Sequence, residues 1–327
     1  MTAATEFNLI NKYFSYSTNR NDVVLGVGDD CALLNPPAGK QLAVTVDTLV
    51  CGVHFPENTS PEDVAYKSLA VSLSDLAAMG AEPAWATLAL TLPNSSEAWL
   101  EEFSMSFKKT LHDYGVQLVG GDTTQGPLSI TVQLTGFVDA KKTMRRDAAK
   151  VGDKIYVTGY LGDAALGLNL LNVFELPDPT IRYASVKKLN RPLAHVGFAQ
   201  KAVEYCACAI DISDGLIADL GHILKASACG AKIYFDQLPR SKAFHKCAVY
   251  LNDLDYKKML LAGGDDYELC LVIPADNEEA LLLLAESMDV LLTHIGVIDN
   301  SGELSVINTS GESIELNLSG YEHFAHE

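Results

Sequence analysis

The residues in this sequence best suited to chemistry are aspartates that stand beside glycines or at the ends of predicted strands and helices. Six short segments carry them: GVGDD at 26–30, VDT at 46–48, SLSDL at 72–76, GGDTT at 120–124, DISDG at 211–215 and GGDDYE at 263–268. Any one of these segments can form a tight turn, because glycine adopts positive φ and aspartate hydrogen-bonds its own backbone. Six of them exceed what turn chemistry supplies, and together they favour a site for cations.

Asp75 is the acid that a turn explains least. It lies near the end of a predicted helix, in the apolar stretch LAVSLSDLAAMG, where a carboxylate faces the negative end of the helix dipole and loses hydration on burial. A bound cation would compensate for both effects. Carboxylate oxygens suit Mg²⁺ or Ca²⁺ better than Zn²⁺, and Mg²⁺ usually keeps waters and substrate phosphates among its ligands. Several such aspartates therefore predict several ions and a phosphate-rich substrate, for which ATP is the obvious candidate.

The familiar nucleotide-binding motifs are missing. The pattern GxxxxGK(S/T) fails because Gln41 follows Gly39-Lys40 and Leu34 occupies the position of the first glycine. The pattern GxGxxG, begun at position 26, fails because Cys31 stands where the third glycine belongs, and neither HRD nor DFG occurs. An ATP-using enzyme with this sequence belongs to another class.

The balance of charges limits the partners of the chain. Its 327 residues include 24 Lys and Arg against 42 Asp and Glu, a formal net charge of −18, so neither nucleic acid nor an anionic membrane is an expected partner. No apolar run approaches the roughly 20 residues that span a bilayer, and the segment Met1–Arg20 has no signal pattern. The seven cysteines lack the spacing of a zinc site. We expect a cytoplasmic protein.

Hydrophobic periodicity predicts the elements that position these residues. A helix begins with particular clarity at Ser60-Pro61, where a capping residue precedes a proline and two acids, and it stops at Gly80. We expect further helices at 6–14, 95–115, 164–173, 193–206, 278–287 and in a segment that ends near 227. We expect strands at 41–46, 85–92, 116–119, 129–138, 155–158, 231–235, 269–273 and 294–298.

The basic, polar segment KKTMRRDAAKVGD at 141–153 interrupts this pattern and indicates a surface connection between two domains. The length also exceeds what one hydrophobic core usually serves. We therefore expect an α/β (α+β) protein with one domain at 1–148 and a second at 149–327.

The motifs GVGDDCALL, TVDTLVCGVHF, SLSDLAAMGAEP, VGGDTT, IDISDGL and GGDDYELC, in this order, resemble the thiamine-monophosphate kinase family, which belongs to the superfamily of aminoimidazole ribonucleotide synthetase. The resemblance runs from about Phe7 to Tyr321. It implies an N-terminal domain that binds ATP and Mg²⁺ and dimerises through a barrel-like sheet, and a C-terminal α+β domain that completes the active site. It also implies a homodimer.

The activity that the resemblance implies is direct transfer of the ATP γ-phosphoryl group to thiamine monophosphate, assisted by several Mg²⁺ ions; it leaves a role for K⁺ open. Matching motifs assign metal binding to Asp30, Thr45, Val46, Asp47, Asp75, Asp122, Asp211 and Asp214. They assign ATP contacts to Gly121, Asp122, Arg146 and Ser213, and contacts to thiamine monophosphate to His54, Asp265 and Tyr321. The family usually has glutamate where this chain has Asp265, so the substrate acid is one methylene shorter.

The chemistry of the acceptor agrees with a site that has no catalytic acid or base. A phosphate monoester has a second pKa of about 6, so its oxygen is already largely anionic at neutral pH. Repulsion between two polyanions, about 4 kcal/mol per unit pair at an effective dielectric of about 20, is the larger obstacle. From the residues alone, His54 could still be a surface histidine, Arg146 a solvated charge and Tyr321 a packing anchor. Another ATP-using enzyme of the superfamily and a non-catalytic protein that binds divalent cations remain the alternatives.

Overall fold

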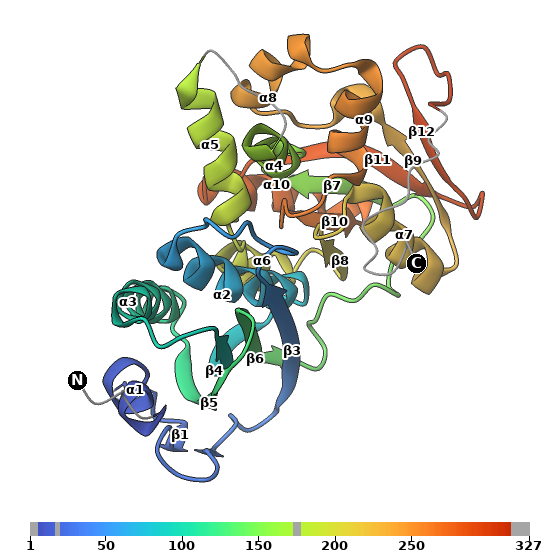
Figure 1. Ribbon diagram of the computed structural model, residues 1–327. Helices are drawn as coiled ribbons and strands as arrows, with labels where there is room; N and C mark the ends of the chain where they lie inside the picture. Colours follow the sequence, from blue (N-terminus) through green and yellow to red (C-terminus); the bar gives the residue numbers. More distant parts are fainter. Residues whose placement is uncertain (1–5, 17–19, 173–177, 315–327) are drawn as a thin grey trace. The chain divides into compact units, whose positions relative to one another are not determined.

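The chain divides into two compact units. The computed structural model describes residues 6–16, 20–172 and 178–314 (Figure 1). Unit 1 comprises Met1–Leu76 and Ala81–Lys141, and unit 2 comprises Ala77–Gly80 and Lys142–Glu327. That the segments 1–148 and 149–327 each fold as a domain stays a prediction. Within the described ranges, none of the helices has the length and apolar character needed to span a bilayer.

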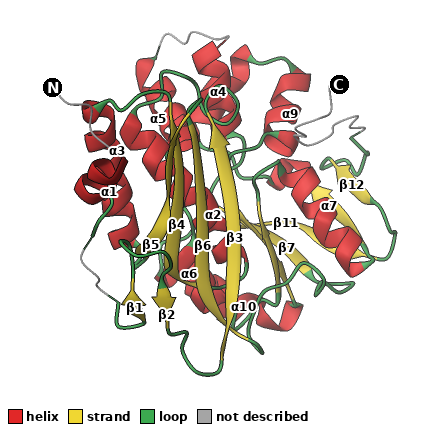
Figure 2. Cartoon of the chain, turned by 60° about the horizontal axis from the view of Figure 1, so that its bottom comes forward, coloured by secondary structure: helices red, strands yellow, loops and turns green. Residues whose placement is uncertain are grey.

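Unit 1 is built on a four-stranded sheet. Its helices are α1 (Glu6–Tyr13), α2 (Pro61–Ala78) and α3 (Glu97–Asp113), and its strands are β1 (Val23–Leu25), β2 (Leu33–Leu34), β3 (Lys40–Val50), β4 (Glu82–Leu92), β5 (Gln117–Gln125) and β6 (Ser129–Asp139). The sheet has the order β3-β6-β4-β5, and only β4 and β5 run parallel. Figure 2 shows these four strands side by side. The sheet stays open within one chain.

The predicted start of α2 is confirmed. The Asp63 N–H donates to the Ser60 hydroxyl at 3.2 Å, and Pro61 opens the helix where no N–H is needed. Gly80 follows the last turn at φ +69°, a conformation that a side chain would disfavour. The clear capping pattern therefore fixes the helix that carries Ser72 and Asp75.

Two strands are longer than the sequence predicts, and this corrects the expectation that their acids end strands or form turns. Strand β3 runs on through Asp47 to Val50, because β6 pairs with it along its whole length. Strand β5 continues through the GGDTT segment, where Asp122 pairs with Ala89 of β4 after a bulge. Partners far away in the sequence thus override the local turn preference of Gly and Asp.

Unit 2 contains a six-stranded sheet of order β12-β9-β11-β7-β10-β8, antiparallel except for β12 and β9. Its strands are β7 (Lys154–Thr158), β8 (Cys208–Asp211), β9 (Gly230–Tyr234), β10 (Leu269–Ile273), β11 (Leu292–Asp299) and β12 (Leu304–Ile307). Its α-helices are α4 (Asp163–Asn172), α5 (Pro179–Asn190), α6 (Val196–Ala202), α7 (Leu216–Ser227), α8 (Lys242–Cys247), α9 (Asp253–Ala262) and α10 (Glu278–Ser287), with 3₁₀ turns at Phe235–Gln237, Ala248–Tyr250 and Ala275–Asn277.

The predicted bounds of β10 and α10 are confirmed, whereas α5 was not predicted. All five residues of β10 are buried, as expected of an apolar run inside a sheet. The buried face of α5 includes Ser185 and Asn190, which blur its apolar periodicity. The segment 142–153 contains neither helix nor strand, as predicted, but Met144 is fully buried within it.

Gly121 shows why glycine is required where β5 approaches β4. Its φ is +152°, and a Cβ at this position would lie 1.9 Å from the carbonyl oxygen of Leu88. The adjacent Gly120 has open space around the same position. Close packing of two strands, besides any contact with a ligand, therefore accounts for glycine in the GGDTT segment.

We expect Gly121→Ala to lower the free energy of unfolding by about 1–3 kcal/mol, because the two strands must separate locally to admit the methyl group. Urea unfolding of the full chain measures this change. Gly120→Ala is the matched control and should leave the midpoint nearly unchanged. Equal midpoints for the two variants would contradict the packing argument.

Candidate active site

In unit 1, two oxygen-rich contacts join β3 to α2. Thr45 and Asp47 lie two residues apart on β3 and so share one face of the strand, while Ser72 and Asp75 lie three residues apart on α2. The Ser72 hydroxyl donates to the Asp47 carboxylate at 2.6 Å, and the Thr45 hydroxyl donates to the Asp75 carboxylate. The structure therefore brings together three of the predicted metal ligands. An oxygen-only donor set of this kind fits a hard cation such as Mg²⁺.

The environment of Asp47 disfavours its anionic form. Burial raises the pKa of its carboxyl group, while the hydrogen bond from Ser72 and the charge of His54 partly oppose the rise. Within the described residues, Asp47 makes no ion pair. A cation near Asp47 would offset the loss of hydration.

His54 lies in the turn after β3. Its Nδ1 accepts a hydrogen bond from the Val50 N–H at 3.0 Å, which places the proton of the neutral imidazole on Nε2. The Lys67 ammonium donates to the His54 carbonyl oxygen at 3.2 Å. The imidazole is therefore oriented by its own turn.

A cavity of about 540 Å³ lies in unit 1, a size typical of small-molecule sites. Apolar side chains of α1 and β5, among them Ile10 and Leu118, form part of its wall. Three predicted site residues, Asp30, Gly121 and Asp122, also line it. The cavity thus combines an apolar surface with carboxylates from two segments far apart in the sequence.

In unit 2, the ends of β8 and β10 bring two predicted segments side by side. Asp211 is the last residue of β8 and pairs with Leu269 of β10. Beyond the strands, the Tyr267 N–H donates to the Ile212 carbonyl and the Asp265 N–H to the Ser213 carbonyl, each at 2.8 Å. The predicted substrate acid therefore lies against the loop that carries predicted ATP and metal contacts.

Asp219 was missed in the sequence. Its carboxylate accepts hydrogen bonds from the N–H groups of Ser213 and Asp214, both at 3.0 Å, and so holds the loop before α7. Burial raises its pKa to about 7. The signal was present, since Asp219 lies between Leu216 and Leu220 on the apolar side of its helix, the pattern that singled out Asp75.

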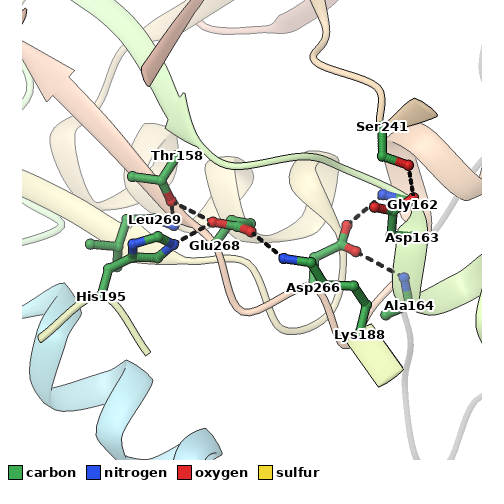
Figure 3. Close-up of polar contacts among 10 residues, drawn as sticks. All are labelled: Thr158, Gly162, Asp163, Ala164, Lys188, His195, Ser241, Asp266, Glu268 and Leu269. Carbon is green, nitrogen blue, oxygen red and sulfur yellow. Dashed lines mark hydrogen bonds and ion pairs between the residues drawn. The ribbon is translucent and has the colours of Figure 1, made fainter. Parts of the chain in front are cut away.

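Asp266 and Glu268 belong to the GGDDYE segment, but the sequence predicts no role for them. Both are buried. Figure 3 shows their contacts. Asp266 accepts from the N–H groups of Gly162 and Ala164, at 2.7 and 3.3 Å, at the start of α4. Burial raises the pKa of Asp266 well above its ordinary value. Burial alone would also raise the pKa of Glu268. The hydrogen bond and charge of His195 and the charge of Lys188 outweigh burial and hold this pKa below its usual range.

Arg146 and Tyr321 differ from the other predicted contacts. The Arg146 side chain is exposed, and its carbonyl oxygen accepts from the Ser227 hydroxyl at 2.8 Å. Tyr321 lies outside the described residues. In the part of the chain that the structure describes, no three His, Cys, Asp or Glu side chains gather as a ready metal site. The metal assignments therefore stay predictions.

Comparison with known proteins places this geometry in a family. The model of the AIR synthase related protein N-terminal domain matches residues 28–138, and that of the C-terminal domain matches residues 150–308. Thiamine-monophosphate kinase of Salmonella typhimurium is 46% identical over 327 residues, with 99% of each chain covered. That of Escherichia coli O157:H7 is 48% identical over 325 residues, with the same coverage.

Solved structures agree. The crystal structure of thiamine-monophosphate kinase from Stenotrophomonas maltophilia K279a matches with a TM-score of 0.85 and 44% identity, over 96% of this chain and 99% of that one. A structure described as AaThiL complexed with AMPPCP and TMP matches with a TM-score of 0.77 and 30% identity, over 91% and 92%. The two-domain α/β fold class is thereby confirmed. The chain belongs to the thiamine-monophosphate kinase family of AIR synthase related proteins.

Proposed function

We propose that this chain transfers the γ-phosphoryl group of ATP to thiamine monophosphate, giving thiamine diphosphate and ADP. The observation that carries the proposal is the match to thiamine-monophosphate kinases at 46% and 48% identity over nearly the whole chain. The related structure with AMPPCP, an ATP analogue, and TMP supports the same pair of substrates. Phosphoryl transfer between two such substrates needs positioning and charge compensation more than covalent chemistry.

The residues of unit 1 divide between the nucleotide and the ions. The cavity lined by Gly121 and Asp122 would hold part of ATP. Asp47 and Asp75, with Thr45, would hold Mg²⁺, and Asp30 and Asp122 would add carboxylates beside the cavity. When bound, Mg²⁺ would neutralise charge on the donor and acceptor phosphates. The backbone carbonyl of Val46 would add a further oxygen.

The remaining residues would orient the two substrates. Ser213 and Arg146 would contact ATP, while Asp211 and Asp214 would add ligands for the ions. Asp265, His54 and Tyr321 would contact thiamine monophosphate. His54 fits this role because its Nε2–H is a donor that a phosphate oxygen can accept. The acceptor phosphate is already anionic, so none of these residues needs to remove a proton.

The direct test supplies the purified full chain with ATP, Mg²⁺ and thiamine monophosphate and separates the products by chromatography. We expect equal amounts of thiamine diphosphate and ADP, and steeper dependence on Mg²⁺ than the ATP complex alone requires. Release of ADP without thiamine diphosphate would point to another ATP-using enzyme of the superfamily. Binding of Mg²⁺ without turnover would point to a non-catalytic cation-binding protein. Replacing Na⁺ by K⁺ in the same assay tests for a monovalent-ion effect.

We expect Asp47→Asn to lower turnover about a hundredfold or more, because metal charge stabilisation is worth several kcal/mol. In the presence of EDTA, the same variant should be at least as stable as the wild type. Burial raises the pKa of the Asp47 carboxyl group, so the folded wild type at pH 7 bears the cost of a buried charge that asparagine lacks. Steady-state rates at saturating Mg²⁺ and urea unfolding at pH 7 measure the two effects. Normal turnover would exclude a metal role for Asp47.

Arg146→Ala should raise KM for ATP about tenfold, a loss of about 1.4 kcal/mol, because a guanidinium offers paired donors to phosphate. Arg145→Ala is the matched control. Arg145 is a neighbouring exposed arginine whose guanidinium already pairs with Asp147 at 2.6 Å. Its substitution should leave KM for ATP unchanged. If both variants retain the wild-type KM, Arg146 is a solvated surface charge.

We also propose that unit 1 pairs with a second copy of the chain. Among the strands that the structure describes, β3 has a neighbour in its sheet on one side only. On the face away from α2, its residues Leu42, Val44 and Val46 are 50–61% exposed. An apolar stripe of this kind on a strand at the edge of an open sheet favours a protein partner. Two such sheets would give the barrel-like arrangement that the resemblance implies.

Val44→Glu should shift the protein to monomers, because a carboxylate in the middle of the stripe would be desolvated on pairing. Analytical ultracentrifugation at micromolar concentration measures the change. Met105→Glu, which replaces an apolar side chain 67% exposed on α3, is the control and should leave the assembly intact. A wild-type chain that sediments as a monomer would exclude the homodimer.

A cytoplasmic location remains part of the proposal. All seven cysteines lie in the described ranges and none forms a disulfide, and five of them are buried. Free thiols are typical of reducing compartments such as the cytoplasm.

A further inference from the structure

The three acids of the segment GGDDYE have different environments. Asp266 and Glu268 are 9% and 3% exposed, whereas Asp265 is half-buried. Asp265 is also the residue that our proposed function assigns to thiamine monophosphate. The two buried acids are therefore placed to support Asp265 and not to contact the substrate themselves.

Glu268 is held from three other segments (Figure 3). The Thr158 hydroxyl, at the end of β7, donates to its Oε2 at 2.7 Å, and the Nε2 of His195, which precedes α6, lies 2.6 Å from the same oxygen. The Lys188 ammonium, on α5, lies 3.8 Å from its Oε1. The Thr158 oxygen also accepts from the Leu269 N–H at 2.8 Å. Glu268 thus ties the start of β10 to β7, α5 and the segment before α6.

The surrounding backbone is shaped to admit this carboxylate. Gly159 follows β7 at φ +54°, and a Cβ there would lie 2.1 Å from Oε1 of Glu268. A side chain at position 159 would displace Glu268 from its donors. The Glu268 carboxylate therefore packs directly against the backbone of Gly159, and only glycine at position 159 leaves room for it.

The segment that contains the two buried acids is strained at two positions. Asp265 and Tyr267 have φ of +68° and +51°, and neither is glycine. Residues in this left-handed region keep such a conformation only where their surroundings fix it. The N–H groups of both residues donate to carbonyls of the loop at 212–213. The side-chain anchors are Asp266, bonded to the N–H groups of Gly162 and Ala164, and Glu268, bonded as above. Both anchors lie within one residue of a strained position.

We propose that Glu268, held by His195 and Thr158, is a positioning residue that sets the conformation of residues 264–267 and thereby the placement of Asp265 against thiamine monophosphate. The inference rests on the proposed function and extends it to residues that do not touch the substrate. A buried carboxylate with cationic partners is costly to desolvate and often contributes little net stability. Placement of the loop is the role that the contacts and the strained backbone support.

The adjacent loop has its own anchor. The Asp219 carboxylate of α7 holds the N–H groups of Ser213 and Asp214, whereas the Glu268 side chain is held by other segments. Backbone hydrogen bonds, from the Ile212 N–H to the Glu268 carbonyl and from the Asp265 N–H to the Ser213 carbonyl, also join the two loops. Disturbing Glu268 should therefore affect the thiamine monophosphate contact much more than the ATP contact of Ser213. This difference separates positioning from general loss of structure, which would affect both substrates.

The test is Glu268→Gln, which keeps the size of the side chain and removes its charge. We expect KM for thiamine monophosphate to rise about tenfold while KM for ATP changes less than about twofold. Glu278→Gln is the matched control. Glu278, the first residue of α10, accepts hydrogen bonds from the Lys154 ammonium at 2.5 Å and from the Tyr156 hydroxyl, so its substitution tests the effect of removing another carboxylate that contacts β7. It should leave both KM values unchanged.

A second pair of variants tests the inference even if Glu268→Gln does not fold. His195→Gln can still donate to Glu268, whereas His195→Ala cannot. We expect the glutamine variant to retain KM for thiamine monophosphate near the wild-type value, and the alanine variant to raise it. Rescue by glutamine alone would not follow from a role in packing the imidazole ring.

The outcomes separate this inference from the proposed function. A wild-type chain that forms no thiamine diphosphate refutes the function itself. An active wild type with an unchanged KM for thiamine monophosphate in folded Glu268→Gln overturns the inference alone. An unchanged KM in Asp265→Ala overturns the inference and also the proposed contact of Asp265, but not the activity. Equal increases in both KM values, or the same increase in Glu278→Gln, would also overturn it, because they indicate a general structural effect.

Discussion

Buried carboxylates need hydrogen-bond donors or cations close by. In each unit, the segments that supply these donors determine which loops and helix ends the buried acids hold in place. In unit 2, Asp219, Asp266 and Glu268 are buried and bonded to backbone or side-chain donors from other segments. Each thereby fixes a loop or a helix start that bears a predicted contact residue or supports one. In unit 1, Asp47 receives the Ser72 hydroxyl and makes no ion pair with any described residue.

This contrast suggests two uses for the same chemical group. A carboxylate surrounded by protein donors is part of the frame, because its interactions are complete before a ligand arrives. A buried carboxylate that receives one hydroxyl donor and makes no ion pair with a described residue is better suited to receive a cation, as proposed for Asp47. The cost of keeping Asp47 anionic without metal then becomes part of the binding energy for the ion. In the proposed role of Asp47, stability and activity would oppose each other at this residue, as is common in active sites.

The net charge of −18 acquires a more specific meaning in this context. For an enzyme that transfers a phosphoryl group between two phosphorylated molecules, a surplus of acid opposes substrate binding, since like charges repel. Ions held by a few of the acids would reverse the sign of the local potential. The cavity beside Asp30 and Asp122 has carboxylates at its wall together with apolar side chains, which suits a ligand that brings both a ring and metal-bound phosphates.

The sequence by itself determined the family, the two-domain α/β class, the start of α2 and the bounds of β10 and α10, because these follow from local capping, from continuous apolar runs and from ordered motifs. Tertiary structure decided the rest. Asp47 and Asp122 lie inside strands because β6 and β4 pair with them, and the residues next to them in the sequence do not indicate this pairing. The directions of the two buried acids in GGDDYE likewise depend on donors from Gly162, Thr158 and His195, more than 70 residues away in the chain. Burial and non-local hydrogen bonds, which no short motif encodes, separate the acids that frame the site from those that can meet its ligands.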